Sequence, residues 1–271
     1  MSVHTEAAES AVARDLVGRV AIVTGGAKGI GRGIVEALAR HGASVVVADL
    51  DVEEGRRVAD HIAQDGARMR AFSLDVTSWE DNQRLVAEVL DELGQVDILV
   101  NNAGVSKSVP FLDIDETEWD RVFNVNVKGA YLATRAVLPH MIERRYGKVV
   151  NVSSMVGKEA IPLFVHYSAS KFAVIGMTQG VAKETAEHGI NVNAVCPGVV
   201  RTPLWEPLLD QLSANKGISR DEAFQEFIAG IPLGRPQEPE DIGEVVAFLA
   251  SEKARNMTGQ GINVTGGMQL H

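Results

Sequence analysis

The sequence predicts an α/β protein built on a doubly wound parallel sheet with helices on both faces. Short runs of apolar, mostly β-branched residues, typical of buried parallel strands, alternate with longer segments whose apolar residues recur at helical spacing. No linker or low-complexity stretch interrupts the middle of the chain. With 271 residues, of which 45% are hydrophobic and 23% charged, the chain can bury the core that one such domain needs.

The first predicted unit is a strand, a glycine-rich segment and a helix. The apolar run Val20–Thr24 predicts a buried strand, and it leads directly into Gly25–Gly31. A helix with apolar residues on one face follows and ends at His41-Gly42. Glycines between a strand and a helix let the backbone approach a pyrophosphate, which then binds the free N–H groups at the helix N-terminus.

The second predicted strand makes a dinucleotide site the preferred interpretation. Ser44–Ala48 ends at Asp49, 18 residues after Gly31. A carboxylate at this place can accept hydrogen bonds from an adenosine ribose. Strand, glycines, helix, strand and acid thus occur in the order of a dinucleotide-binding unit, and the sequence predicts a single-domain Rossmann fold.

The remaining strands and helices continue the alternation. A helix is predicted around Leu85–Leu93, stopped by Gly94, because its apolar residues recur every three or four positions. Further strands are predicted at Met69–Leu74, Val96–Val100, Val149–Val152, Ile190–Val195 and Ile262–Val264. Ligands of doubly wound sheets bind beyond the carboxyl ends of the strands, so the residues that follow these strands are the candidates for a site.

A tyrosine and a lysine four residues apart, Tyr167 and Lys171, indicate the chemistry. On a helix they project from one face. A neighbouring ammonium favours the phenolate, so we expect a lowered pKa for Tyr167. A phenol that exchanges a proton near neutral pH is what the interconversion of a carbonyl and an alcohol requires. Ser154 stands 13 residues before Tyr167.

Five motifs occur in order along the chain. They are Thr24-Gly25-x-x-x-Gly29-x-Gly31, Asn101-Asn102-Ala103-Gly104, Asn126 within Asn124–Gly129, Ser154 with Tyr167 and Lys171, and Pro197-Gly198 followed by Thr202. In these motifs the chain resembles the short-chain dehydrogenase/reductase family, and the resemblance extends from about Gly18 to Met268.

The resemblance implies a catalytic set of Asn126, Ser154, Tyr167 and Lys171. Tyr167 would protonate the carbonyl oxygen or deprotonate the alcohol, and Ser154 would hydrogen-bond that oxygen. Lys171 would also bind the ribose hydroxyls of a nicotinamide cofactor, and Asn126 would hold a water in a proton relay. Ser153 is the competing hydroxyl, but the spacing to the tyrosine in this family selects Ser154.

The resemblance also implies a cofactor site, and two side chains bear on the choice between NAD and NADP. Asp49 should repel the 2′-phosphate of NADP, whereas Lys28 stands where NADP-using members often have a basic residue. A close carboxylate should outweigh one flexible lysine, so we expect NAD rather than NADP. The expected cofactor-binding residues are Gly25, Lys28, Gly29, Ile30, Gly31, Asp49, Asp75, Val76, Asn102, Ala103, Gly104, Tyr167, Lys171, Pro197, Gly198, Val200 and Thr202.

The segment 203–231 is expected to form a mobile lid over the substrate, which Trp205, Ser154 and Tyr167 would contact. Thr202–Trp205 and the lid length look like the acetoin/butanediol and sugar-alcohol dehydrogenases of the family, which implies a small diol, polyol or hydroxyketone. The alternatives are a 3-oxoacyl-thioester (acyl-carrier-protein) reductase using NADPH, a hydroxysteroid dehydrogenase, and a catalytically silent dinucleotide-binding scaffold.

Composition restricts the partners and the compartment. The formal net charge of −10, without a basic block, argues against a surface for nucleic acid or anionic membrane. No apolar stretch approaches the roughly 20 residues of a membrane span. The seven histidines have no metal-ligand spacing, so no metal is expected. One cysteine and no secretory signal favour a reducing cytoplasm.

The expected organisation is a flexible N-terminal extension over residues 1–17 and one catalytic domain over residues 18–271. The family resemblance further implies a homotetramer. In it, the apolar helical stretches Val122–Leu138 and Phe172–Val181 would pack between subunits.

Overall fold

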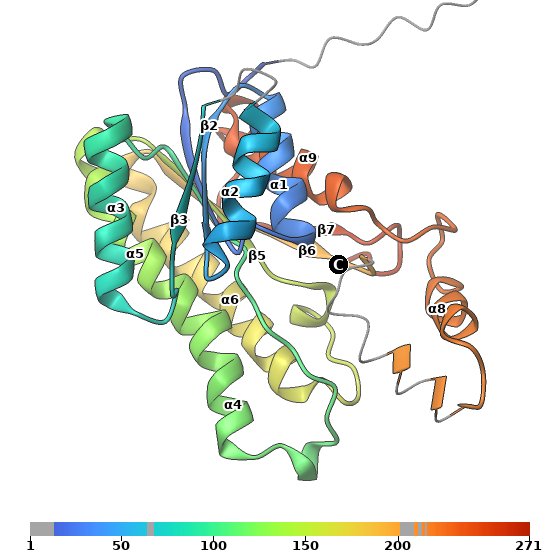
Figure 1. Ribbon diagram of the computed structural model, residues 1–271. Coiled ribbons are helices and arrows are strands. Elements are labelled where there is room, and N and C mark those ends of the chain that lie inside the picture. Colours follow the sequence, from blue (N-terminus) through green and yellow to red (C-terminus); the bar gives the residue numbers. More distant parts are fainter. Residues whose placement is uncertain (1–13, 64–67, 201–208, 211–212, 215) are drawn as a thin grey trace, which may run out of the picture.

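The computed structural model describes residues 14–63, 68–200, 209–210, 213–214 and 216–271. These residues contain one parallel sheet of seven strands in the order β3-β2-β1-β4-β5-β6-β7 (Figure 1). The strand order changes direction between β1 and β4, which is where a ligand crevice opens in such sheets. The strands are β1 (Val20–Thr24), β2 (Ser44–Asp49), β3 (Met69–Ser73), β4 (Ile98–Asn101), β5 (Gly147–Val152), β6 (Ile190–Pro197) and β7 (Gly261–Val264).

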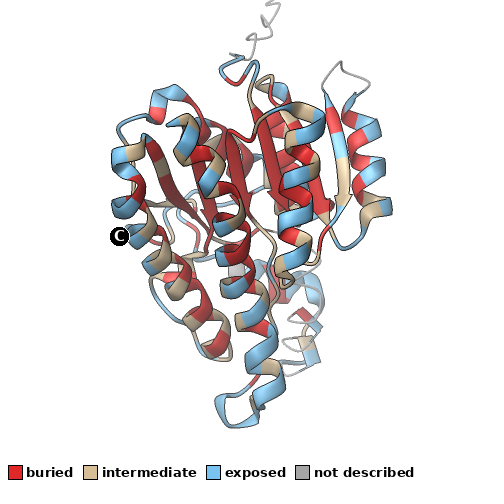
Figure 2. Ribbon diagram, turned by 90° about the vertical axis from the view of Figure 1, so that its left-hand side faces the viewer, coloured by how far each residue is buried: buried red, intermediate tan, exposed pale blue. Residues whose placement is uncertain are grey.

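Helices cover both faces of this sheet (Figures 1 and 2), which confirms the doubly wound fold. One face packs against α1 (Gly29–Arg40), α2 (Val52–Ala63) and α9 (Pro239–Ala250). The other packs against α3 (Trp79–Leu93), α5 (Ala130–Arg144) and α6 (Val165–Thr185). The chain also forms α4 (Glu116–Phe123), a π-helical turn (Asn124–Gly129) and α8 (Arg220–Ile228). None of the helices that the structure describes is long and apolar enough to cross a membrane.

The strands lie where the sequence predicts them, with small differences at their ends. Three ends differ by two residues: β5 begins at Gly147 rather than Val149, β6 ends at Pro197 rather than Val195, and β4 begins at Ile98 rather than Val96. The Val96 N–H donates to Nε2 of His140 at 3.3 Å instead of joining a neighbouring strand. The α3 helix ends at Gly94 as predicted, because this glycine takes the left-handed conformation (φ 77°) that closes a helix.

The expected flexible extension up to residue 17 is too long. Leu16 is buried in the core that α1 and α9 share, and its N–H donates to the carbonyl of His41 at 2.9 Å. Leu16 is apolar and belongs to the core, so residues 14–17 are attached to the folded body.

The described part of the expected lid has a small apolar core of its own. Leu209, Phe224 and Ile231 pack with Val199, just after β6. The α8 helix begins with a capping box, in which Ser219 and Glu222 satisfy each other's backbone N–H groups. Local packing therefore holds this part of the lid together, independently of the main core.

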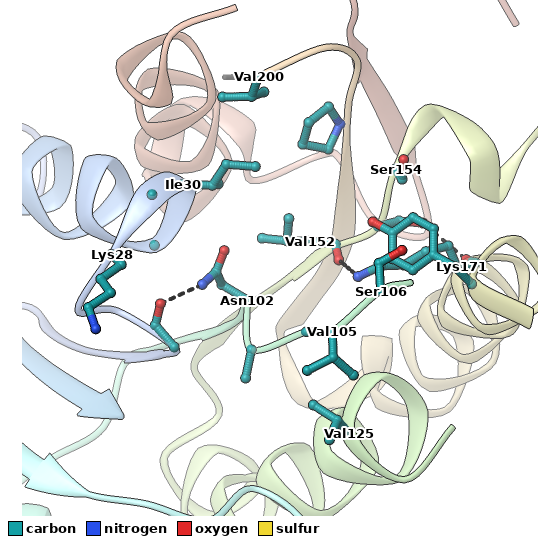
Figure 3. A pocket seen from close by; sticks show the side chains of 18 of the residues that line it. Lys28, Ile30, Asn102, Val105, Ser106, Val125, Val152, Ser154, Lys171 and Val200 are labelled. Carbon is teal, nitrogen blue, oxygen red and sulfur yellow. Dashed lines mark hydrogen bonds between the residues drawn. The ribbon is translucent and has the colours of Figure 1, made fainter. Parts of the chain in front are cut away.

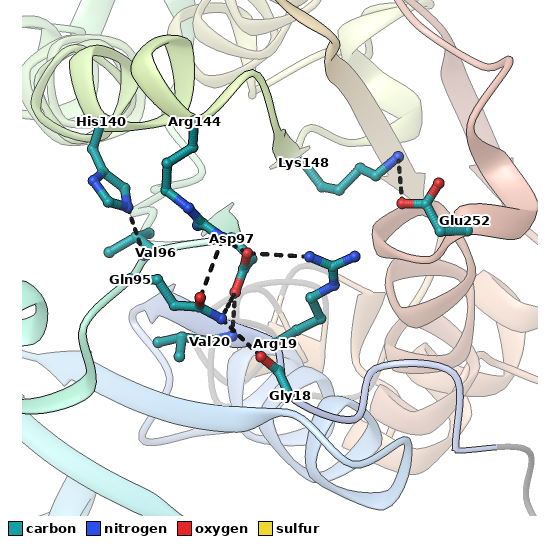
Figure 4. Close-up of polar contacts among 10 residues, drawn as sticks. All are labelled: Gly18, Arg19, Val20, Gln95, Val96, Asp97, His140, Arg144, Lys148 and Glu252. Atoms are coloured by element: carbon teal, nitrogen blue, oxygen red, sulfur yellow. Dashed lines mark hydrogen bonds and ion pairs between the residues drawn. The ribbon is translucent and has the colours of Figure 1, made fainter.

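A buried carboxylate ties the amino-terminal edge of the sheet together (Figure 4). Asp97 is fully buried, and its Oδ2 accepts hydrogen bonds from the Val20 N–H at 2.8 Å and from Gln95 at 2.7 Å. Its Oδ1 accepts from Arg144 at 3.0 Å and from Arg19 at 3.4 Å. A buried charge is tolerated when its lone pairs are satisfied in this way.

We predict that Asp97→Ala lowers the free energy of unfolding by about 3 kcal/mol, because it leaves two arginines and one backbone N–H without their acceptor. Asp60→Ala, which removes an exposed carboxylate on α2, is the matched control and should change the free energy by no more than about 0.5 kcal/mol. Urea denaturation of the two variants measures the difference. Equal stability of the two variants would show that the Asp97 contacts contribute nothing net.

Candidate active site

A cavity of about 480 Å³ lies beyond the carboxyl ends of the central strands (Figure 3). It brings together segments that are far apart in the sequence: the glycine segment after β1, the residues after β2, β4, β5 and β6, and the start of α6. The predicted site residues that line it are Gly25, Lys28, Gly29, Ile30, Gly31, Asp49, Asp75, Val76, Asn102, Ala103, Gly104, Ser154, Tyr167, Lys171, Pro197, Gly198 and Val200.

The glycine segment packs so closely against neighbouring backbone that a side chain at two of its positions would clash. A Cβ at Gly31 would lie 2.0 Å from the Gly25 carbonyl oxygen, and a Cβ at Gly25 would lie 2.9 Å from Cα of Ala103. Asn102 holds the segment in place by donating from Nδ2 to the carbonyls of Gly25 (2.8 Å) and Thr24 (3.0 Å). No side chain caps the N-terminus of α1. Its free N–H groups and the bare backbone fit a dinucleotide pyrophosphate.

The two side chains that bear on cofactor choice have different surroundings. Asp49 accepts the backbone N–H groups of Ala27 and Asp51, both at 3.0 Å, and these bonds fix its carboxylate at the cavity. Lys28 instead forms an ion pair with Asp51, Nζ to Oδ2 2.7 Å, on the protein surface. This hydrogen bond raises the pKa of Lys28 and lowers that of Asp51. The positive charge at Lys28 is therefore already matched by a carboxylate.

The carboxyl end of β5 and the helix α6 position the side chains that the sequence predicts to be catalytic. Lys171 Nζ donates to the carbonyl of Val152 at 2.9 Å, and the Ser153 hydroxyl donates to the carbonyl of Lys171 at 3.0 Å. Ser153 is thus occupied by this structural bond. The Ser154 oxygen accepts the Val156 N–H at 3.3 Å, and its hydroxyl hydrogen-bonds Tyr167 at the cavity. The arrangement supports the choice of Ser154 over Ser153.

The prediction of a lowered Tyr167 pKa is wrong, because the surrounding protein raises this pKa. Burial raises the pKa of Tyr167 to about 12, although a hydrogen bond from Ser154 acts in the opposite direction. Burial also lowers the pKa of Lys171 to about 8. The ammonium lies 5.6 Å from the centre of the Tyr167 ring. The loss of hydration at both groups therefore outweighs their attraction, since each charged form loses water.

Asn126 lies in the π-helical turn and supports the cavity wall. Its Oδ1 accepts the Val105 N–H at 2.8 Å, and its Nδ2 donates to the Val105 carbonyl at 3.0 Å. The second N–H of the same amide donates to the Ser170 hydroxyl at 3.0 Å, and that hydroxyl donates to the Tyr167 carbonyl at 2.7 Å. Both amide N–H groups are therefore used, and a role of Asn126 in a water relay remains a prediction.

Several wall residues escape prediction from the sequence. Ser106, Met155, Ile161 and Phe164 line the cavity, in loops that follow β4 and β5. The sequence signal that could have identified them is their position close to Asn101–Gly104 or to the helix that carries Tyr167. Two predicted residues, Thr202 and Trp205, lie outside the described residues. Within the described ranges, no group of three or more His, Cys, Asp or Glu residues could hold a metal.

Comparison with known sequences gives related proteins over almost the whole chain. A model of the short chain dehydrogenase family matches residues 19–227. Oxidoreductase UcpA of Salmonella typhimurium is 40% identical over 256 residues, covering 94% of this chain and 96% of the relative. L-2,3-butanediol dehydrogenase of Corynebacterium glutamicum is 40% identical (92% and 98% covered), and 3-oxoacyl-acyl-carrier-protein reductase FabG of Thermotoga maritima is 38% identical (94% and 99% covered).

Comparison of the fold with solved structures gives relatives of the same family. The crystal structure of a short-chain alcohol dehydrogenase from Sinorhizobium meliloti 1021 superposes with a TM-score of 0.87 at 37% identity, over 94% of this chain and 98% of that one. Sequence match, fold and cavity agree. The chain belongs to the short-chain dehydrogenase/reductase family and is an NAD(P)-dependent oxidoreductase acting on CH–OH groups.

Proposed function

We propose that the protein interconverts a small vicinal diol and the corresponding hydroxyketone with NAD as its cofactor. The observation that carries this proposal is the convergence of Ser154, Tyr167 and Lys171 on one cavity with the glycine segment and Asp49. The bound nicotinamide supplies or accepts the hydride. The protein provides the binding, the orientation and the proton transfer.

In the proposed reaction the Tyr167 hydroxyl exchanges a proton with the substrate oxygen. Ser154 donates a hydrogen bond to the same oxygen and stabilises the negative charge that develops there. Lys171 holds a positive charge near the phenol, which favours proton loss from Tyr167 during oxidation. Asn126 hydrogen-bonds Val105 in the cavity wall and Ser170 in α6, and so fixes the wall relative to the start of this helix.

The preference for NAD rests on the charges around the adenosine end. Asp49 is fixed at the cavity, where its carboxylate would accept ribose hydroxyls and repel a 2′-phosphate. Lys28 is the nearest cation on this side, and its pairing with Asp51 weakens its attraction for a phosphate.

A small, uncharged substrate fits the charges around the other end. Among the described lining residues, only Lys28 and Lys171 are cationic. The lid residues Lys216 and Arg220 form ion pairs with Glu226 and Asp210, respectively. Among the described residues of the cavity wall and the lid, little unpaired positive charge is left to bind a phosphopantetheine arm or an acidic carrier protein. Relatives named butanediol dehydrogenase and diacetyl reductase favour the same substrate class.

The second candidate is a 3-oxoacyl-thioester reductase that uses NADPH. The specific observation in its favour is the 38% identity to the reductase FabG of Thermotoga maritima over 255 residues. The charges around the cavity argue against it.

A third element of the proposal is a homotetramer. Phe172 and Tyr131, on α6 and α5, are 45% and 46% exposed, and both lie in the stretches expected to pack between subunits. Aromatic side chains at this exposure are typical of interface cores.

We predict that Tyr167→Phe lowers kcat/KM by roughly 10²–10⁴-fold or more, because only the proton-exchanging hydroxyl is lost. NADH binding, measured by fluorescence, should stay close to wild type. Tyr131→Phe removes a hydroxyl from an exposed ring on α5 and is the control. More than about a tenth of wild-type activity in Tyr167→Phe would refute the role assigned to this tyrosine.

We predict a wild-type preference for NAD over NADP in kcat/KM, which Asp49→Ala should narrow by removing the repulsive carboxylate. Asp51→Ala should narrow the preference for NAD by a smaller factor, because Lys28 then loses its ion-pair partner and can attract the 2′-phosphate of NADP. Steady-state kinetics with both cofactors measures the three enzymes. A wild-type preference for NADP would show that Lys28 dominates after all.

We predict that acetoin, 2,3-butanediol or a hexitol gives a higher kcat/KM than acetoacetyl thioesters or simple secondary alcohols assayed under the same conditions. A site that hydrogen-bonds a second oxygen should reject mono-alcohols, because its polar groups would be left unpaired. The highest kcat/KM on the thioester would establish the reductase alternative instead.

We predict a tetramer in sedimentation velocity at micromolar concentration, and a smaller species for Phe172→Asp, since a buried carboxylate at a subunit contact is costly. A wild-type protein that sediments as a stable monomer would contradict this assembly.

A further inference from the structure

The segment that follows β4 is a fixed part of the cavity wall. The side-chain amide of Asn126 hydrogen-bonds both the N–H and the carbonyl of Val105. Four residues later, the Val109 N–H donates to the carbonyl of Leu163 at 2.9 Å. Leu163 has a φ of 67°, a left-handed conformation that costs a leucine about 1–2 kcal/mol. The stretch between these two contacts is therefore held between Asn126 and the loop that leads into α6.

Ser106 lies within this stretch and lines the cavity at its catalytic end. Figure 3 shows Ser106 with Ser154 and Lys171 at one end, away from Lys28. The backbone agrees with this placement, because a Cβ added at Gly104 would lie 3.5 Å from Nζ of Lys171. The neighbouring wall residues Met155, Ile161 and Phe164 are apolar. A hydroxyl among them is the polar group that a second substrate oxygen would meet.

The hydroxyl of Ser106 is shielded from solvent and has no hydrogen-bond partner among the residues that the structure describes. An unpaired buried hydroxyl costs about 1–3 kcal/mol. A serine has three staggered positions about its Cα–Cβ bond, so this oxygen can also point in directions other than the shielded one. Within the described ranges, the chain thus keeps a polar group without a protein partner at the end of the cavity where Ser154 and Lys171 lie.

We propose that Ser106 is a specificity-determining residue that hydrogen-bonds the second oxygen of the substrate, the one that does not react. This rests on the proposed diol or hydroxyketone activity and explains how the enzyme would distinguish such substrates from mono-alcohols. The reacting oxygen binds Ser154 and Tyr167, and the neighbouring oxygen binds Ser106. A mono-alcohol leaves this hydroxyl unpaired, at a cost in transition-state stabilisation.

Ser108 provides a matched control. Its hydroxyl is also shielded and unpartnered among the described residues, and it lies in the same segment, but it does not line the cavity. Replacing either serine by alanine removes the same group from the same stretch of backbone. Only the Ser106 variant should alter the choice of substrate.

The experiment compares wild type, Ser106→Ala, Ser106→Thr and Ser108→Ala, with acetoin and 2-butanone as paired substrates. In Ser106→Ala the ratio of kcat/KM for acetoin to that for 2-butanone should fall about tenfold, the usual effect of one lost hydrogen bond. Ser106→Thr, which keeps the hydroxyl, should retain most of the ratio, and Ser108→Ala all of it. The Tm of Ser106→Ala should equal or exceed that of wild type, because no protein hydrogen bond is lost.

Three results would overturn the assignment: an unchanged ratio in Ser106→Ala, an equal fall in Ser108→Ala, or a loss of NADH affinity in Ser106→Ala that accounts for the kinetic change. Failure of the proposed function gives a different result. In that case the wild-type enzyme itself would show no preference for acetoin over 2-butanone.

Discussion

The site depends on a reciprocal pair of hydrogen bonds between the end of β5 and the helix α6. Lys171 donates its ammonium proton to the carbonyl of Val152, and Ser153 donates its hydroxyl proton to the carbonyl of Lys171. Each segment thus supplies one side-chain donor and one backbone acceptor to the other. The packing is tight enough that a Cβ at Gly157 would lie 2.6 Å from the Ser153 oxygen. Ser154 and Tyr167 are adjacent to this contact, and their relative position follows from it.

Holding the catalytic pair inside the protein has an electrostatic cost. The pKa of Tyr167 rises to about 12 and that of Lys171 falls to about 8, each because burial disfavours the charged form. Opposite shifts of this kind are typical of functional sites, where neighbouring groups must exchange protons. Among the protein groups, the hydrogen bond from Ser154 moves the tyrosine back toward ionisation. The protein therefore supplies the geometry, the Ser154 hydrogen bond and the nearby ammonium of Lys171, which both favour the phenolate.

Asn126 connects the start of α6 to the segment that follows β4. Through Ser170 its amide reaches the carbonyl of Tyr167, and on its other side it fixes Val105, next to Ser106. A substitution at this asparagine would disturb two walls at once, so its effects on turnover and on specificity should not separate. This coupling gives a structural reason for an asparagine in a π-helical turn, where the widened backbone presents the side chain between both segments.

The sequence by itself determined the sheet and the identity of most cavity residues. Apolar runs, glycines such as Gly31 and the acid Asp49 act through local geometry, and strand periodicity places their neighbours at one edge of the sheet. Only the tertiary structure decided the properties that depend on distant neighbours. These include the sign of the Tyr167 pKa shift, the pairing of Lys28 with Asp51, the burial of Leu16 and the shielded hydroxyl of Ser106. Desolvation and hydrogen-bond pairing arise from contacts across the fold, and no local pattern encodes them.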